Sequence, residues 1–189
     1  MLCEGELVKY VCPGKPDSNG LISRRSIITS LLKYLLCEKA SKDHGYFLAI
    51  TSIKSISLKL VNEVRFPLFR VIFNCRTFMP FQGEILQGVV DQVFRSGMGL
   101  LLRSGPLKWV YLSAIKMPGY SFIPGENPSF LHDKFGKIEA GVVVRFSVLS
   151  FRWIGRRWGD ARNELAVLAS IEGEYLGPLP EVQPDDIVL

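Results

Sequence analysis

The sequence is poor in the residues that bind metal ions. Its 189 residues include four cysteines and two histidines. No two cysteines form a Cys-x-x-Cys pair, and neither histidine stands three or four positions from a cysteine or from the other histidine. Zinc sites need such spacings, so we expect no metal, no cofactor, and cysteines that are reduced and buried. The residues concerned are Cys3, Cys12, Cys37, Cys75, His44 and His132.

Long hydrophobic runs and secretion signals are also absent. No stretch approaches the ~18 to 20 apolar residues of a membrane-spanning helix. No Asn-x-Ser/Thr site occurs, and the first residues lack the hydrophobic core of a signal peptide. We therefore expect a soluble intracellular protein. Its net charge of +5 suits contact with nucleic acid or acidic partners without requiring it.

No group of residues has the spacing of a catalytic site. Gly14–Lys15–Pro16 lacks the upstream glycine and the Ser/Thr of a phosphate-binding loop. Gly97–Met98–Gly99 lacks the third glycine of a dinucleotide-binding loop. His132 and Asp133 are adjacent, but no nucleophile accompanies them. The sequence predicts a protein without catalytic residues of its own.

One amphipathic helix is predicted in the N-terminal part of the chain. Apolar residues recur at helical spacing between Ile27 and Leu36. Ser23 or Ser26 can cap the start of the helix, because a hydroxyl accepts a hydrogen bond from a free backbone N–H. The residues 43–45 predict its end. A helix this apolar on one side requires a flat surface to pack against.

Three segments after the helix predict that surface, a small sheet. Residues 46–53 are apolar and β-prone, and residues 56–60 and 69–76 alternate between apolar and polar side chains. The alternation places Arg70 and its polar neighbours on the side away from the helix. The N-terminal part therefore predicts an α+β domain.

Five further strands are predicted after Pro80, with a long irregular stretch at 116–130 between the third and the fourth. This arrangement is typical of the OB fold, an all-β five-stranded Greek-key barrel. The predicted strands cover residues 85–93, 99–102, 107–112, 142–151 and 165–171. The predicted domains are 1–79 (helix on sheet), 80–176 (OB fold) and 177–189 (acidic, proline-containing tail).

Several motifs resemble the seventh-subunit family of DNA-directed RNA polymerases, whose members form a stalk. Residues 80–90, Pro-Phe-Gln-Gly-Glu-Ile-Leu-Gln-Gly-Val-Val, are similar to the start of the OB domain in the polymerase II subunit. Residues 45–53 resemble a strand of its tip domain, and 104–106 resemble its mid-barrel turn. Residues 116–128, Lys-Met-Pro-Gly-Tyr-Ser-Phe-Ile-Pro-Gly-Glu-Asn-Pro, are similar to the plant form found in RNA polymerases IV and V.

The resemblance implies a non-catalytic nuclear subunit. It implies a heterodimer with a fourth-subunit partner, docking of the tip domain on the polymerase core at the largest subunit, and contact of the OB domain with nascent single-stranded RNA. It also implies a role in RNA-directed DNA methylation. The residues predicted to dock on the core are Ile53, Ser55, Ile56, Leu58 and Leu60.

RNA binding by a barrel needs a basic groove and exposed aromatic faces. Trp109 and Tyr111 alternate along one strand and so point to the same side. Large rings in small barrels are more often buried, so we expect Trp109 in the core, whereas Tyr111 is suited equally to contact and to packing. Related RNA-binding barrels often carry a phenylalanine where this chain has Gly99. The residues predicted to bind RNA are Arg95, Arg103, Lys108, Tyr111, Arg145, Arg156, Arg157 and Arg162.

Two other functions fit the sequence. One is the equivalent subunit of RNA polymerase II, and the other is a free-standing OB-fold protein that binds single-stranded RNA. The sequence also leaves open whether the chain serves polymerase IV, polymerase V or both. An enzyme is disfavoured, because no nucleophile, base or metal cluster can be assembled.

Overall fold

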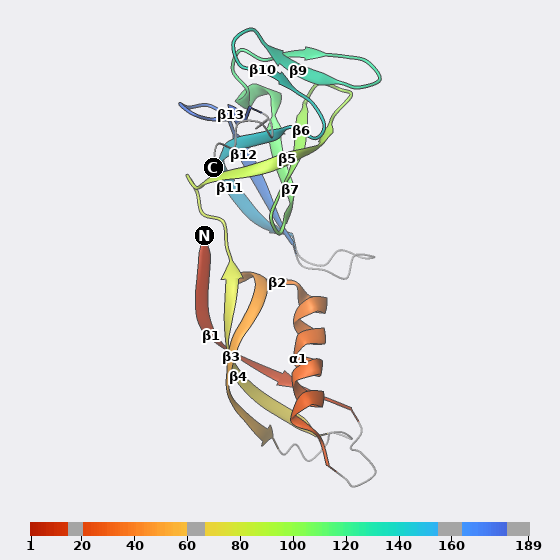
Figure 1. Ribbon diagram of the computed structural model, residues 1–189, viewed down its shortest axis with the longest axis vertical. Coiled ribbons are helices and arrows are strands. Elements are labelled where there is room, and N and C mark those ends of the chain that lie inside the picture. The colour runs from red at the N-terminus through yellow and green to blue at the C-terminus, as the bar shows by residue number, and fades with distance from the viewer. Residues whose placement is uncertain (15–20, 60–66, 155–163, 181–189) are drawn as a thin grey trace, which may run out of the picture. The chain divides into compact units, whose positions relative to one another are not determined.

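The described residues of the computed structural model form two compact units (Figure 1). The first contains Met1–Met79 with Trp153, Ile154 and Glu164, and the second contains 80–152 and 165–180. The chain first passes from one unit to the other between Met79 and Pro80, and it returns to the first unit after Arg152. The structure describes residues 1–14, 21–59, 67–154 and 164–180.

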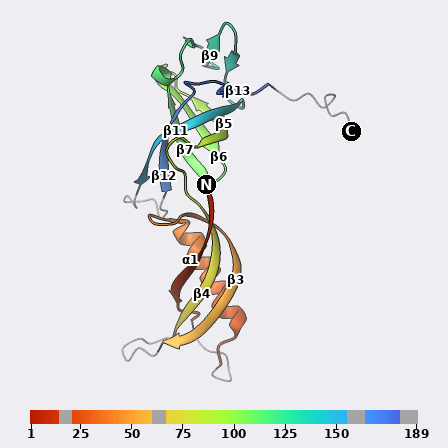
Figure 2. The same cartoon turned by 90° about the vertical axis from the view of Figure 1, so that its left-hand side faces the viewer.

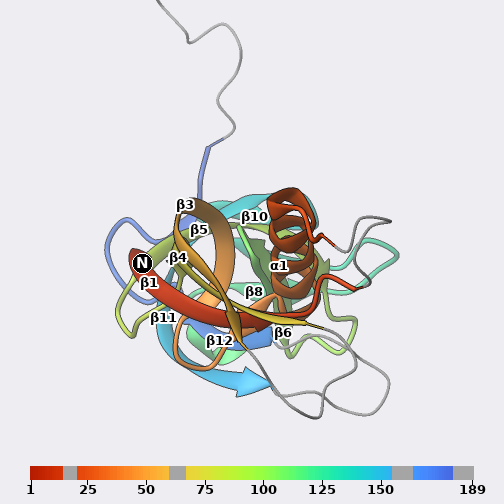
Figure 3. The ribbon, with the colours of Figure 1, turned by 90° about the horizontal axis from the view of Figure 1, so that it is seen from below.

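The first unit is a four-stranded antiparallel sheet with one helix on one face (Figures 1 and 3). The strand order is β1-β4-β3-β2. Its two long central strands, β3 and β4, curve together (Figure 2). The elements are β1 (Leu2–Val11), α1 (Arg24–Glu38), β2 (Ala40–Ser41), β3 (Gly45–Lys59) and β4 (Leu68–Phe78).

Helix α1 begins where the sequence predicts. The backbone N–H of Ser26 donates a hydrogen bond of 3.1 Å to the hydroxyl oxygen of Ser23, which satisfies one of the free N–H groups of the first turn. The apolar face of the helix packs on β1 and β4. The residues of this core are Leu7, Val11, Ile27, Leu31, Leu35, Val71, Phe73 and Cys75.

The helix ends earlier than predicted. Its last residue is Glu38, before the expected break at 43–45. Lys39 adopts a left-handed φ of 62°, and its backbone N–H donates a hydrogen bond of 2.7 Å to the carbonyl of Leu35. This reversal leads the chain into β2, which pairs with the start of β3.

Strand β3 departs from a simple two-residue alternation between Phe47 and Ile56. Its register against β4 shifts three times, and each shift adds a residue to β3, so that every third residue faces the helix. The register is regular between Ile56 and Leu58, so these two residues lie on the same face, as predicted. Only Ile56 packs against the core, whereas Leu58, near the end of the strand, is 53% exposed. The residues of β3 that pack against the core are Phe47, Ile50, Ile53 and Ile56.

The cysteines differ in their surroundings. Cys75 is buried in the core of the first unit, and burial raises the pKa of its thiol. Cys3, Cys12 and Cys37 are exposed free thiols. The expectation of buried cysteines is wrong for these three. Cys3 lies near the start of β1, outside the core cluster, Cys12 follows the end of β1, and Cys37 lies on the exposed side of α1.

The second unit contains the predicted five-stranded barrel. Its strands follow the order β12-β7-β6-β5-β11, and pairing of β11 with β12 closes the ring. Strand β12 runs parallel to β7, whereas the β5–β6, β6–β7 and β5–β11 pairs are antiparallel. The predicted OB fold is confirmed. The strands are β5 (Ile85–Val93), β6 (Gly99–Ser104), β7 (Leu107–Ser113), β11 (Val143–Ile154) and β12 (Glu164–Ser170).

The barrel interior is filled by apolar side chains at alternate positions of these strands. Each of the five strands contributes buried residues, and outward-facing residues stand between them. Buried residues include Val90, Leu100, Leu102, Val110, Leu112, Val144, Phe146, Val148, Leu165 and Val167.

The stretch expected to be irregular contains a second small sheet. After the short helix η1 (Ala114–Lys116), three strands pair in the order β10-β9-β8. The rings of Phe122 and Phe130 contact each other across this sheet, with their centroids 5.4 Å apart. The strands are β8 (Ser121–Ile123), β9 (Ser129–His132) and β10 (Gly136–Ile138).

A final short strand extends the barrel sheet at β11. Strand β13 (Gly177–Pro178) pairs antiparallel with β11, and the backbone N–H of Leu179 donates a hydrogen bond of 2.8 Å to the carbonyl of Val143. The sequence placed these residues at the start of the tail. In the structure they form one wall of a cavity over the outer face of β11.

Candidate functional site

The outer face of β6 and β7 carries basic and aromatic side chains. Trp109 is 47% exposed, and Lys108 and Arg103 are exposed beside it. The prediction that Trp109 lies in the core is wrong. Leu107 and Val110 take the interior positions of β7. Between the pairs Leu102–Val110 and Ser104–Leu107, β7 has one more residue than β6, and both of its residues there, Lys108 and Trp109, point outward.

Tyr111 lies on the same outer face as Trp109. Its hydroxyl donates a hydrogen bond of 2.9 Å to the carbonyl of Met98, and its ring lies 6.0 Å from that of Phe94. Tyr111 also lines a groove of about 300 Å³ that crosses β12 toward Phe151 and Arg152. A half-buried tyrosine that is held at its hydroxyl and lines a groove can both pack and present its ring to a base.

The predicted basic residues do not form a single groove. Arg95 follows β5 and lines a separate cavity of about 530 Å³. Arg103 lies at the opposite end of the β5–β6 hairpin and makes an ion pair of 2.9 Å with Asp91. Arg145 lies on β11 and lines a third cavity, of about 740 Å³. Arg156, Arg157 and Arg162 lie outside the described residues.

Gly99 cannot carry the aromatic ring found at this place in related barrels. Its φ is 148°, and an added Cβ would lie 2.3 Å from the carbonyl oxygen of Leu112. The close approach of β6 to β7 therefore requires glycine here. Exposed rings at other positions must supply any base stacking by this barrel.

Three aromatic residues around the cavity at Arg145 were not predicted as site residues. They are Tyr120, Phe135 and Tyr175. All three stand in segments without a regular alternation of apolar and polar residues, so no sequence pattern predicted the direction in which their side chains point. Only the pairing of β13 with β11 and of β9 with β10 brings them around one cavity.

The first unit has a groove at one end of its helix. Residues from the start of α1 and from β3 enclose about 400 Å³. Three predicted docking residues line it: Ile53, Ser55 and Ile56. Leu58 lies on the same strand but does not line the groove, and Leu60 lies outside the described residues.

The described residues include no group of three or more His, Cys, Asp or Glu side chains that could hold a metal ion. Within the same part of the chain, neither α1 nor η1 combines the length and the hydropathy needed to cross a membrane.

No protein-family model matches the chain. Individual relatives do match. RNA polymerase V subunit 7 of Arabidopsis thaliana is 42% identical over 166 residues, which cover 87% of this chain and 89% of that protein. RNA polymerase IV subunit 7 of the same plant is 41% identical over 170 residues, or 88% of this chain and 92% of that protein. The chain belongs to the subunit 7 family of DNA-directed RNA polymerases.

The polymerase II member of the family is a more distant relative. RNA polymerase II subunit 7 of Arabidopsis thaliana is 33% identical over 132 residues, covering 64% of this chain and 73% of that protein. The resemblance to the IV and V form is thus confirmed. The chain is an accessory subunit of an RNA polymerase of this type.

Proposed function

We propose that the chain is the non-catalytic stalk subunit of RNA polymerase IV, V or both. In this proposal it acts in the nucleus, pairs with a fourth-subunit partner, docks on the core beside the RNA exit channel and contacts nascent RNA. Its role lies in RNA-directed DNA methylation. The observation that carries the proposal is the 41–42% identity to the IV and V subunits over nearly the full length of both.

The presence of two units supports a separate role for each of them. The helix-on-sheet unit, 1–79, is the proposed tip domain that enters the core. The barrel, 80–176, is the proposed RNA-contacting domain, and 177–189 is the proposed tail. The OB fold commonly binds oligonucleotides on its outer face, where this barrel carries Lys108, Trp109 and Tyr111.

The groove of about 400 Å³ supports the docking part of the proposal. Ile53 and Ile56 pack partly against the core of their own unit, which fixes the groove wall. Ser55 is exposed and lines the groove between them. Four isoleucines line the groove together with Ser55 and the cationic residues Arg24 and Lys54. Such a lining suits an inserted segment of a core subunit that carries apolar and acidic side chains.

The substitution Ser55→Trp tests docking without removing any core side chain. The bulky indole at the edge of the groove should hinder an inserted segment and reduce co-purification of the largest polymerase subunit about tenfold or more, which corresponds to ~1.4 kcal/mol of binding free energy. Ser57→Trp is the matched control, because Ser57 is exposed on the same strand but does not line the groove. Equal recovery of polymerase with both variants would contradict docking at this groove.

A further inference from the structure

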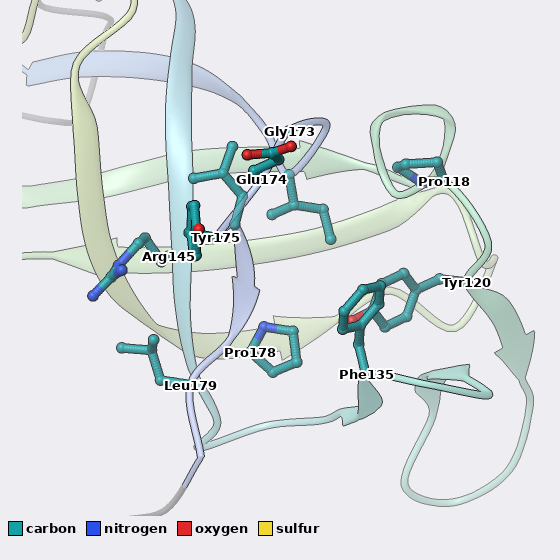
Figure 4. A pocket seen from close by; sticks show the side chains of 11 residues that line it. Pro118, Tyr120, Phe135, Arg145, Gly173, Glu174, Tyr175, Pro178 and Leu179 are labelled. Carbon is teal, nitrogen blue, oxygen red and sulfur yellow. The ribbon is translucent and has the colours of Figure 1, made fainter.

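The cavity at Arg145 is built by four separate parts of the barrel unit (Figure 4). The outer face of β11 forms its base, and the loop from β12 to β13 forms one side. The segment before β8 and the turn between β9 and β10 form the other side. Its volume of about 740 Å³ lies within the ~300–1,000 Å³ range of small-ligand sites.

Aromatic rings stand at both ends of this cavity. Figure 4 shows Tyr120 and Phe135 together at one end and Tyr175 above Arg145 at the other, with Pro178 between them. Phe135 is 63% exposed and Tyr175 is 86% exposed. Exposed rings on either side of one cavity offer faces on which a planar group can stack.

The backbone holds Tyr175 in an unfavourable conformation. Its φ is 64°, a left-handed value that costs a residue with a side chain about 1–2 kcal/mol. Gly173, two residues earlier, has a φ of 145°. Such local strain is found where the surrounding structure holds a residue in place for function, and here it accompanies a ring turned out to the solvent.

Phe135 is also fixed in place. The backbone N–H groups of Lys134 and Phe135 donate hydrogen bonds of 3.0 and 3.4 Å to Nδ1 of His132. The His132 ring lies between those of Phe135 and Tyr120, with centroids 4.7 and 5.0 Å away. The turn therefore has a held backbone and presents the Phe135 ring, in contact with His132, at the cavity.

The cavity offers one cationic group, Arg145, and one carboxylate, Glu174. The Arg145 side chain makes no ion pair or hydrogen bond with any described residue, whereas Arg103 on the other face is paired with Asp91. A guanidinium without a carboxylate partner can bind a phosphate in bidentate geometry. The carboxylate of Glu174 lies at the rim and can accept a hydrogen bond from the amino group of a base.

We propose that this cavity is a binding site for unpaired nucleotides of single-stranded RNA. A base stacks on Tyr175 or Phe135, and the phosphate beside it binds Arg145. This proposal rests on the proposed function that the barrel contacts RNA, and it adds a site apart from the β6–β7 face. A peptide with proline or aromatic side chains could stack on the same rings, but the unpaired guanidinium and the net charge of +5 favour the polyanion.

Photo-crosslinking of RNA to the full-length chain in its affinity-purified complex tests the proposal. The probe is a single-stranded oligonucleotide of about 12 nucleotides that contains thiouridine. Crosslinks should map to the peptides that contain Tyr175 and Phe135.

Binding by two variants tests the roles of the ring and the guanidinium. Tyr175→Ala should weaken RNA binding about 5- to 150-fold, which corresponds to the loss of one stacked base. Arg145→Gln should reduce the slope of binding against salt by about one.

Phe81→Ala is the matched control, because Phe81 is also an exposed ring of the barrel unit but lies outside the cavity. It should leave RNA affinity unchanged.

Three outcomes would contradict the proposal. If Tyr175→Ala binds RNA like the unchanged chain while Trp109→Ala binds weakly, RNA uses the β6–β7 face, and the cavity proposal is overturned while the proposed function stands. If Tyr175→Ala loses a co-purifying protein and keeps its RNA affinity, the cavity is a peptide site and the proposal is likewise overturned. Absence of any crosslink from RNA to the unchanged chain would refute the proposed RNA contact itself.

Discussion

At the scale of single residues, burial changes the acid–base chemistry of Tyr120. Its hydroxyl is buried and has no hydrogen-bond partner among the described residues, and this burial raises the pKa from 10.0 to about 12. The folded chain therefore holds the phenol proton more tightly than the unfolded chain does. The contribution to stability is complete below pH 10 and is lost as the pH rises toward 12.

We predict that Tyr120 ionises late in an alkaline titration. The rise in phenolate absorbance near pH 12 should be smaller by one tyrosine in Tyr120→Phe than in the unchanged chain. The free energy of unfolding, measured in urea, should fall less steeply between pH 10 and 12 in the variant. Identical titrations of the two chains would show that Tyr120 is not the late-ionising residue.

Gly99 gives a second prediction at this scale. In Gly99→Ala the new Cβ would lie 2.3 Å from the Leu112 carbonyl oxygen, so backbone must move. We expect a loss of about 3 kcal/mol or more in the free energy of unfolding, from overpacking together with strain at a positive φ. Gly141→Ala is the control, because its φ is 93° but no atom lies within 4 Å of the added Cβ. It should cost only ~1–2 kcal/mol, and equal losses would argue against close approach of β6 and β7 at Gly99.

Single residues also show what an alternating sequence pattern can and cannot predict about the direction of side chains. The alternation of Trp109 and Tyr111 correctly predicted that both rings face the same side of β7. It could not tell which side is the interior, because that depends on the register with β6 and on the shift between Leu102 and Ser104. The same limit applies to Arg103 and Arg145, whose distance in space depends on how the strands close into a barrel.

At the scale of elements, α1 was predictable because its signals are local. The cap at Ser23 and the apolar repeat at Ile27, Leu31 and Leu35 lie within one short segment. Strand β3 was predictable as a strand but not in its facing, because three bulges change its period from two to three. Bulges are set by pairing with β4, which lies beyond any local window.

The buried stripe of α1 gives a prediction at this scale. Leu31 is 0% exposed, whereas Leu36 on the same helix is 74% exposed. Leu31→Ala should lower the free energy of unfolding by about 2–5 kcal/mol, because it removes buried methyl groups and leaves a cavity. Leu36→Ala should change it by less than about 0.5 kcal/mol. Urea unfolding of the two variants measures both values, and a larger loss in Leu36→Ala would contradict the orientation of the helix.

Strands β8, β9 and β10 were not predicted at all. Their segment is rich in glycine and proline, and each strand has only three or four residues, too few to establish a periodicity. They are held by pairing with one another and by the contact of Phe122 with Phe130. The cavity at Arg145 depends on this small sheet, so its site could not be derived from the sequence either.

At the scale of the whole molecule, the chain folds into two compact units, and its relatives are subunits of the family that the sequence motifs resemble. The barrel was predictable because five strands with a long insertion leave few alternatives. The sequence grouped seven basic residues and Tyr111 as candidates for RNA binding, but the described ones lie at three separate places on the barrel unit. Outward-facing side chains can lie anywhere around a barrel, and their charge alone does not show which of them lie close together.

The account depends most on the assembly that this chain joins. Mass spectrometry of the complex purified through a tag on the full-length chain, expressed in a plant, measures this directly. We predict near-stoichiometric recovery of the largest subunit of polymerase IV or V together with one fourth-subunit partner. Recovery of the chain without polymerase subunits, or with the largest subunit of polymerase II alone, would contradict the account.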